Sequence, residues 1–218
     1  MSCAICALRK EKRFCPAVHG RICPQCCGEQ REVTLDCPAE CVYLQQARQH
    51  EKPRSLHDLP ADGLFPKVDV DHTFIYDHEH LAVGLSYALA KCIRADRDLN
   101  DRELIAALTA LAKKYEILAN SGLHTETQSV SIAQQAVTEE IQKTLAQYRE
   151  VEQKELGYSH LRDSEVLRCL VFLVRMANAQ TSGRPKSRAF ADFVTSRFSS
   201  QKSALTDASQ TTGQIIMP

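Results

Sequence analysis

The chain has 218 residues, of which 44% are hydrophobic and 25% are charged, a balance typical of globular proteins rather than of disordered ones. Its 27 Lys and Arg residues equal its 27 Asp and Glu residues, so the net charge offers no general attraction to nucleic acid or to an anionic membrane. Trp is absent and only 6% of residues are aromatic, which leaves few side chains for stacking on single-stranded bases.

Eight of the ten cysteines lie in the first 41 residues, with the spacing C-x2-C-x8-C-x7-C-x2-C-C-x9-C-x3-C. The N-terminal stretch MSCAICALRKEKRF lacks the apolar core of a signal peptide, and no window is long and apolar enough to cross a membrane. We therefore expect a cytoplasmic protein. Because thiols stay reduced in the cytosol, the cysteine cluster favours metal binding over disulfides.

The number and spacing of these cysteines predict two zinc sites. A structural zinc ion takes four ligands in a tetrahedron, so eight cysteines fill two sites with none left over. Adjacent Cys26 and Cys27 point in different directions from the backbone and are not expected to share an ion. The predicted ligands are Cys3, Cys6, Cys23 and Cys26 for the first ion, and Cys15, Cys27, Cys37 and Cys41 for the second. The two sites then interleave along the chain as a cross-brace.

Two alternatives to this all-cysteine assignment stay open. His19 forms a C-x3-H pair with Cys15 and is a rival eighth ligand, which would free Cys26 or Cys27. An iron–sulfur cluster also suits cysteine ligation, although two interleaved sets of four favour zinc. The stretch Asp36-Cys37-Pro38 predicts a helix start, which would place Cys37 and Cys41 one turn apart on a helix that continues to residue 50.

Residues 3–41 resemble the cross-brace zinc fingers of the MYND and HIT type, in which interleaved ligand pairs end on a short helix. The chain departs from that pattern in two places: the last pair is Cys37 and Cys41 without a His, and Cys15 has no partner two residues on. The stretch RICPQCCGEQREVTLDCPAECVYL also resembles one in uncharacterised bacterial proteins. The MYND and HIT resemblance implies a protein-interaction module.

The remainder of the chain predicts a mostly α protein. We expect a zinc-binding module over residues 1–52 that ends in a short helix, a linker or arm over 53–72, a helical bundle over 73–199 and a flexible tail over 200–218. Apolar periodicity and caps predict helices near 74–95, from Asn100 or Asp101 to 119, 129–156, from Asp163 or Ser164 to 181, and 187–198. These four or five helices should form an antiparallel bundle, because no single one can bury its apolar stripe alone.

Acidic residues and histidines near the start of the bundle give a further candidate site. Two D-x-x-H pairs occur, at Asp69/His72 and Asp77/His80, but the E-x-x-H pairs of di-iron bundles are absent from the sequence. Acids near the positive end of a helix dipole explain most of this run. Cys92 lies in an apolar helical stretch, as does Cys169, and both are best interpreted as small core residues.

The sequence favours a non-enzymatic adaptor, in which zinc replaces a hydrophobic core in the module and the protein binds a protein partner. No nucleotide-binding or hydrolase motif occurs. The alternative is a nucleic-acid-binding or redox-responsive regulatory zinc protein. Nucleic-acid binding is suggested by the charge of residues 1–54, which carry nine Lys and Arg residues against six acids. The candidate phosphate contacts are Arg9, Lys10, Lys12, Arg13, Arg21 and Arg31. A weaker alternative is an enzyme with its site near His72–His80.

Overall fold

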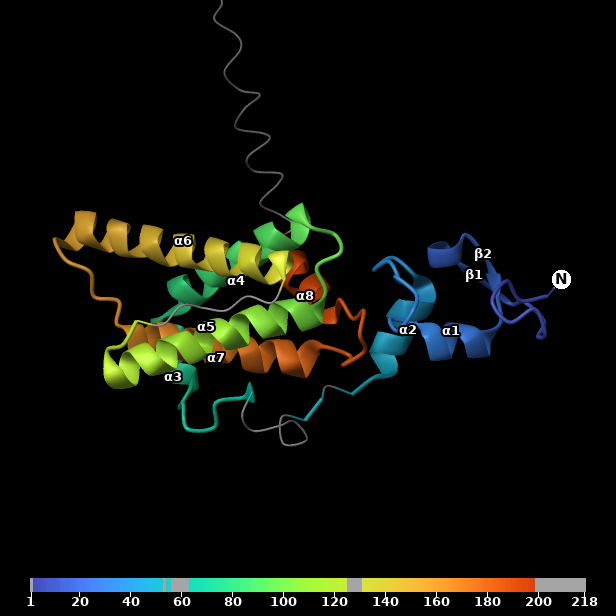
Figure 1. Cartoon of the computed structure of the whole chain (residues 1–218), viewed down its shortest axis with the longest axis horizontal. Helices are drawn as coiled ribbons and strands as arrows, with labels where there is room; N and C mark the ends of the chain where they lie inside the picture. The colour runs from blue at the N-terminus through green and yellow to red at the C-terminus, as the bar shows by residue number, and fades with distance from the viewer. Residues whose placement is uncertain (1, 53, 56–62, 125–130, 199–218) are drawn as a thin grey trace, which may run out of the picture.

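The computed structural model describes residues 2–52, 54–55, 63–124 and 131–198. Within them the chain forms eight α-helices, one 3-10 helix and a single two-stranded sheet, so the mostly α prediction is confirmed (Figure 1). The N-terminal module contains β1 (Arg13–Cys15), η1 (Pro16–Val18), β2 (Gly20–Ile22), α1 (Pro24–Gln30) and α2 (Val42–His50). The helical part contains α3 (His72–Asp77), α4 (Glu79–Ala95), α5 (Asp101–Ser121), α6 (Ile132–Leu156), α7 (Asp163–Gln180) and α8 (Ala189–Arg197).

The module begins with a small hairpin followed by a short helix. Strand β1 pairs antiparallel with β2, and Cys15 lies opposite Gly20. His19 adopts the left-handed conformation at the turn between them, with φ of 49°. Helix α1 then starts at Pro24, a residue suited to the first helical position because its missing N–H would have no partner there. The preceding Cys23 caps this helix by accepting a hydrogen bond from the Cys26 N–H.

The helix expected from residue 37 starts later than the sequence indicates. Helix α2 begins at Val42, and the Cys41 N–H donates to the Pro38 carbonyl in a turn. Asp36, the expected cap, instead accepts from Lys186 Nζ at 2.8 Å. An Asp-x-Pro stretch favours a turn as much as a helix start, and here it forms a turn whose Asp36 pairs with a lysine from the distant loop between α7 and α8. Cys37 and Cys41 therefore do not share a helical face.

Two of the bundle helices, α5 and α6, start at a side-chain cap and stop at a glycine. Asn100 accepts from the Glu103 N–H at the start of α5, and Gly122 ends that helix in the left-handed conformation that glycine tolerates. Ser131 caps α6 in the same way, and Gly157 ends it with φ of 83°. The predicted helix over 74–95 is divided at His78, whose ψ of 26° breaks the run into α3 and α4.

One continuous core holds the helical part together. Helix α5 packs against α7 and α6, and α4 packs against α6 and α8 (Figure 1). The apolar stripes of these helices supply its fully buried side chains, among them Leu85, Leu89, Leu104, Leu108, Leu111, Ile141, Leu145, Leu170 and Phe190. None of the described helices is long and apolar enough to span a membrane.

The described part of the predicted linker lies against α7. Arg175 on that helix donates to the carbonyls of Leu64, Phe65 and Val68 at 3.1, 2.8 and 2.8 Å. Phe65 is 4% exposed and contributes to the bundle core. Most of the first half of the predicted linker, and the predicted tail over 200–218, fall outside the described residues.

A separate buried cluster lies in the module, at the end of the bundle where the N-terminus is found (Figure 1). Its buried members are mostly cysteines, joined by two aliphatic side chains: Cys3, Cys15, Ile22, Cys23, Cys26, Cys27 and Leu35. So small an apolar cluster supplies little hydrophobic free energy, and segments of this size usually need a metal or disulfides to fold.

Candidate metal centre

Two backbone turns carry the four cysteines of the first predicted site. The first turn contains Cys3 and Cys6, and it is closed by hydrogen bonds from the Cys3 N–H to the Arg9 carbonyl and from the Ala7 N–H to the Cys3 carbonyl. The second is the beginning of α1, where Cys23 is the cap and Cys26 lies in the first helical turn. Each C-x2-C pair thus presents two sulfurs from one side.

The sulfurs of Cys3, Cys6, Cys23 and Cys26 all lie within 4.8 Å of one another. Three of these residues are buried, and Cys6 is half-buried. Sulfurs about 2.3 Å from a tetrahedral zinc ion are separated from one another by about 3.8 Å. A small contraction of the observed cluster therefore produces a complete four-sulfur site, and the group could hold a metal ion.

Backbone amides favour the thiolate form of two of these cysteines. Burial opposes ionisation of Cys3, but the N–H groups of Cys6, Cys23 and Ile5 outweigh it and lower the Cys3 pKa to about 6. The Cys26 N–H lowers the Cys23 pKa, against an opposing effect of burial. The matching hydrogen bonds run from the Cys23 N–H to Cys3 Sγ at 3.2 Å and from the Cys26 N–H to Cys23 Sγ at 3.4 Å.

Two further pKa shifts occur at the cluster: one keeps the Cys26 thiol neutral, and the other keeps Arg9 charged. Burial raises the pKa of Cys26 to about 12, and hydrogen bonds with the neighbouring thiols add to this effect. Arg9 lies beside the cluster, and its hydrogen bond with Cys23 raises the arginine pKa. A cation at the centre would remove the repulsion between the sulfurs and displace the remaining protons, as metal binding to thiols does.

The second predicted set is not gathered in the same way. Within the described residues, the cluster of Cys3, Cys6, Cys23 and Cys26 is the one group of three or more metal-binding side chains brought this close. Cys27 is buried, and its sulfur accepts from Arg13 Nη1 at 3.5 Å and from Arg31 Nη2 at 4.0 Å. Successive residues of a helix are rotated by about 100°, so Cys26 and Cys27 point to different sides of α1.

The other three members of that set lie in the same neighbourhood. Burial raises the pKa of Cys37, and the nearby Cys41, Cys15 and Glu32 raise it further, while the Glu32 N–H lowers it. His19, the alternative ligand, is exposed at the hairpin turn and does not belong to the four-sulfur cluster. The assignment of a second ion to Cys15, Cys27, Cys37 and Cys41 stays a prediction.

The acidic and histidine run at the start of the bundle has structural contacts. Asp71 caps α3 by accepting from the Phe74 N–H at 2.8 Å, and Arg168 lies 3.5 Å from the same carboxylate. His78 stacks on Phe74 and lies 3.8 Å from Glu165. No metal-binding group forms from these side chains within the described residues. The interpretation as a solvated helix start explains these contacts.

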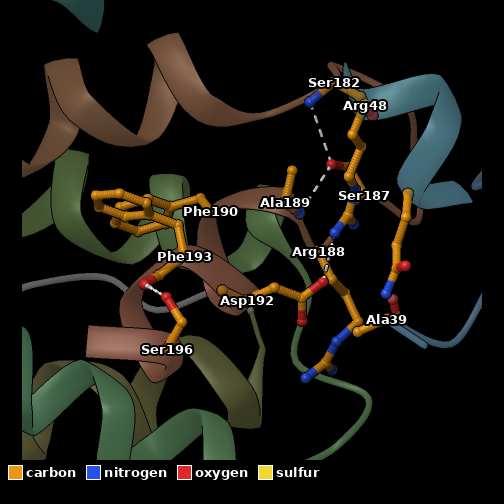
Figure 2. Close-up of polar contacts among 12 residues, drawn as sticks. Ala39, Arg48, Ser182, Ser187, Arg188, Ala189, Phe190, Asp192, Phe193 and Ser196 are labelled. Atoms are coloured by element: carbon orange, nitrogen blue, oxygen red, sulfur yellow. Dashed lines mark hydrogen bonds and ion pairs between the residues drawn. The ribbon is translucent and has the colours of Figure 1, made fainter. Parts of the chain in front are cut away.

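A polar junction that the sequence does not predict joins the module to the bundle. Glu32 is 2% exposed, and its carboxylate accepts from Arg48 Nη2 and from Ser182 Oγ, each at 2.9 Å. Arg48 also donates to Asp192 on α8 at 2.7 Å, and Figure 2 shows Arg48, Ser182 and Asp192 around this junction. Burial lowers the pKa of Arg48, but its bonds to Asp192 and Glu32 raise it overall. No pattern within a short stretch of sequence predicts these contacts, because Glu32 and Ser182 lie 150 residues apart in the chain.

Comparison of the chain with protein-family models, curated proteins and solved structures finds no match. The class of protein is therefore defined by the structure: a helical bundle with an N-terminal four-cysteine cluster that could hold a metal ion.

Proposed function

We propose that the cluster of Cys3, Cys6, Cys23 and Cys26 is a structural zinc site, and that the protein acts as a non-enzymatic adaptor. The observation that carries the metal site is the convergence of four sulfurs within 4.8 Å, three of them from buried residues. A site with four protein ligands leaves no position for water or substrate, which favours a structural role over a catalytic one.

The size of the cluster favours a single ion. Sulfurs within 4.8 Å of one another leave room for one atom at their centre, rather than for a core of several irons and sulfides. Thiolates suit zinc, and the tetrahedral arrangement of four sulfurs is common in structural zinc sites.

A second zinc ion on Cys15, Cys27, Cys37 and Cys41 completes the proposal. These cysteines are buried or half-buried in one small module, and Cys15 and Cys41 are close enough to affect the Cys37 pKa. Binding would require the Cys27 sulfur to move away from Arg13 and Arg31. Small metal sites commonly close only on binding, because the ion supplies the free energy of folding.

The surface of the module supports a protein partner over a nucleic acid. Leu8, Phe14 and Val42 are 88%, 55% and 59% exposed, so the module presents apolar side chains that another protein could cover. Two of its arginines have partners outside the second site: Arg9 at Cys23 and Arg21 at Glu11. These contacts reduce the positive charge available to phosphates. The cytoplasmic location is part of this proposal.

Elemental analysis of the purified protein tests the metal proposal. We expect two zinc ions and no iron per chain, with one zinc lost in Cys26→Ser, one lost in Cys27→Ser and none lost in His19→Ala. A single zinc that persists in Cys27→Ser would overturn the second site, and loss in His19→Ala would overturn the ligand assignment. Iron in place of zinc would overturn the metal identity.

Nucleic-acid binding is tested on the same samples by titration with a fluorescent duplex at several salt concentrations. The adaptor proposal predicts no binding. Affinity that falls steeply with salt would instead support the nucleic-acid-binding alternative, because phosphate contacts release counterions.

A further inference from the structure

We infer that the hydrogen bonds between the module and the loop joining α7 to α8 depend on metal in the N-terminal site. Metal binding and docking of the module on the bundle are then coupled. This inference rests on the proposed zinc site, and it assigns a conformational response to that site. Three connected sets of hydrogen bonds carry the argument, one at each step between the sulfurs and the bundle.

The first step is helix α1, which joins the metal site to the loop. Its N-terminal turn carries Cys23 and Cys26. At its C-terminal end the carbonyls of Gly28 and Arg31 accept from Arg184 Nη1 at 3.1 and 2.7 Å. Carbonyls at a helix end have no partner within the helix, so a cation from the bundle satisfies them. A change in the orientation of α1 at the sulfurs therefore moves the groups that Arg184 binds.

The second step is Glu32, which follows the C-cap residue Arg31 at the end of α1. This residue holds φ of 54°, a conformation that a non-glycine residue keeps only when its surroundings fix it. Its carbonyl accepts from the Lys186 N–H at 2.8 Å, and its buried carboxylate accepts from Arg48 and Ser182. Its N–H lies at the Cys37 sulfur, so this residue contacts both a cysteine of the module and the loop.

The third step anchors the loop in the bundle. The Ser182 N–H donates to Ser187 Oγ at 3.2 Å (Figure 2), and this bond is followed by one from Ser187 Oγ to the buried Asp101 carboxylate at 2.7 Å. The same carboxylate accepts from the N–H groups of Phe190 and Ala191 at the start of α8. Continuous hydrogen bonding thus runs from the module, through the loop, to the first residue of α5 and the first turn of α8.

These contacts give the coupling its direction. With zinc bound, the turn around α1 is fixed, and Glu32 is held where Ser182 and Lys186 can bind it. Without the metal, the module loses its main source of folding free energy, because its own apolar cluster is small. Glu32 then leaves the loop, and the module separates from the bundle while the bundle keeps its own core.

Amide hydrogen exchange of the full chain, with zinc and after removal of zinc by a chelator, tests the coupling. We expect exchange at Lys186, whose N–H binds Glu32, to become faster by on the order of tenfold or more without zinc. Amides in the middle of α5 should not change, since they belong to the bundle core. Zinc content is measured on the same samples. If the purified chain contains no zinc, the proposed zinc site itself is overturned. A chain that binds zinc, but whose Lys186 exchange is unaffected by its removal, overturns the coupling alone.

Two variants separate coupling from simple damage to the fold. Arg184→Ala removes the bonds to α1 from the bundle side, without touching the module, and Glu32→Gln removes the buried charge. Both should keep their zinc, exchange rapidly at Lys186 and respond little to the chelator. Glu29→Gln is the matched control, because Glu29 is exposed on α1 and its carboxylate accepts a hydrogen bond from Gln25 on the same helix; it should behave as wild type. Wild-type protection and response to zinc in both Arg184→Ala and Glu32→Gln would show that these contacts do not carry the coupling.

Discussion

Asp101 illustrates how one buried carboxylate can organise two helices. It is the first residue of α5, is 1% exposed, and accepts from Ser187 Oγ and from the N–H groups of Phe190 and Ala191. Asn100, not Asp101, caps α5, so the Asp101 side chain is available to cap α8. A buried charge of this kind is stable only because each of its oxygens has hydrogen-bond donors.

Replacing Asp101 should therefore destabilise the bundle strongly. We expect Asp101→Ala to lower the free energy of unfolding by about 2–4 kcal/mol, because buried donors lose their acceptor. Urea unfolding followed by circular dichroism measures this change. Asp98→Ala, at an exposed position in the preceding turn, should change the free energy by no more than about 0.5 kcal/mol. Equal effects of the two substitutions would contradict the capping role.

A second residue-scale prediction concerns the pH dependence of Cys169. Burial raises the pKa of this core thiol to about 12, whereas its unperturbed value is 9.0. Between these values the unfolded chain loses the proton and the folded chain keeps it, so the thiol's contribution to stability is present below pH 9 and declines above it. The decline should approach about 1.4 kcal/mol for each pH unit.

The measurement compares wild type with Cys169→Ala by urea unfolding at pH 8.0, 9.5 and 10.5. The lost volume in the variant gives a difference that does not depend on pH, while the titration of the thiol gives one that does. The advantage of wild type should shrink as the pH rises. A constant difference across the three pH values would show that Cys169 titrates normally in the folded protein.

At the scale of elements, the α6 cap offers the clearest test of local signals. Ser131 accepts from the Gln134 N–H at 3.1 Å and donates to Glu103 on α5 at 2.8 Å. Ser131→Ala should cost about 1 kcal/mol of stability, since one N–H of the first turn loses its acceptor. The comparison is Ser121→Ala in thermal unfolding, because Ser121 is exposed near the end of α5 and caps no N-terminus. If the two variants melted together, Ser131 would not be stabilising α6.

The limits of the helices differ in how far the neighbouring sequence predicts them. The predicted start of α5 at Asn100 or Asp101 and the predicted end of α6 at residue 156 are confirmed, because a cap involves residues only a few positions apart. Helix α6 begins at Ile132 rather than at the predicted residue 129, and Ser131 is its cap. The division at His78 was not predicted, because the apolar stripe continues through it. There the His78 ring contacts the Phe74 carbonyl and packs on the Phe74 ring, contacts that a periodic pattern does not contain.

At the scale of the whole molecule, two separate buried clusters predict two separable stabilities. The module depends on its cysteines, whereas the bundle has a large aliphatic core. Chelation of zinc should therefore leave most of the helical circular dichroism signal and a cooperative thermal transition in place. The control is readdition of zinc, which should restore the starting state. Loss of most of the helical signal on chelation would mean that the bundle cannot fold without the module.

The sequence by itself determined the helical class, most helix limits and the two C-x2-C pairs whose four sulfurs converge, because these depend on periodicity, caps and turns within short stretches. Only the tertiary structure decided what lies between distant segments. It placed Glu32 against Ser182 and Asp36 against Lys186, because the module packs on the bundle and brings together residues that no pattern along the chain relates. Within the module it turned Cys27 toward Arg13 and Arg31, contacts that the spacing of the cysteines does not contain.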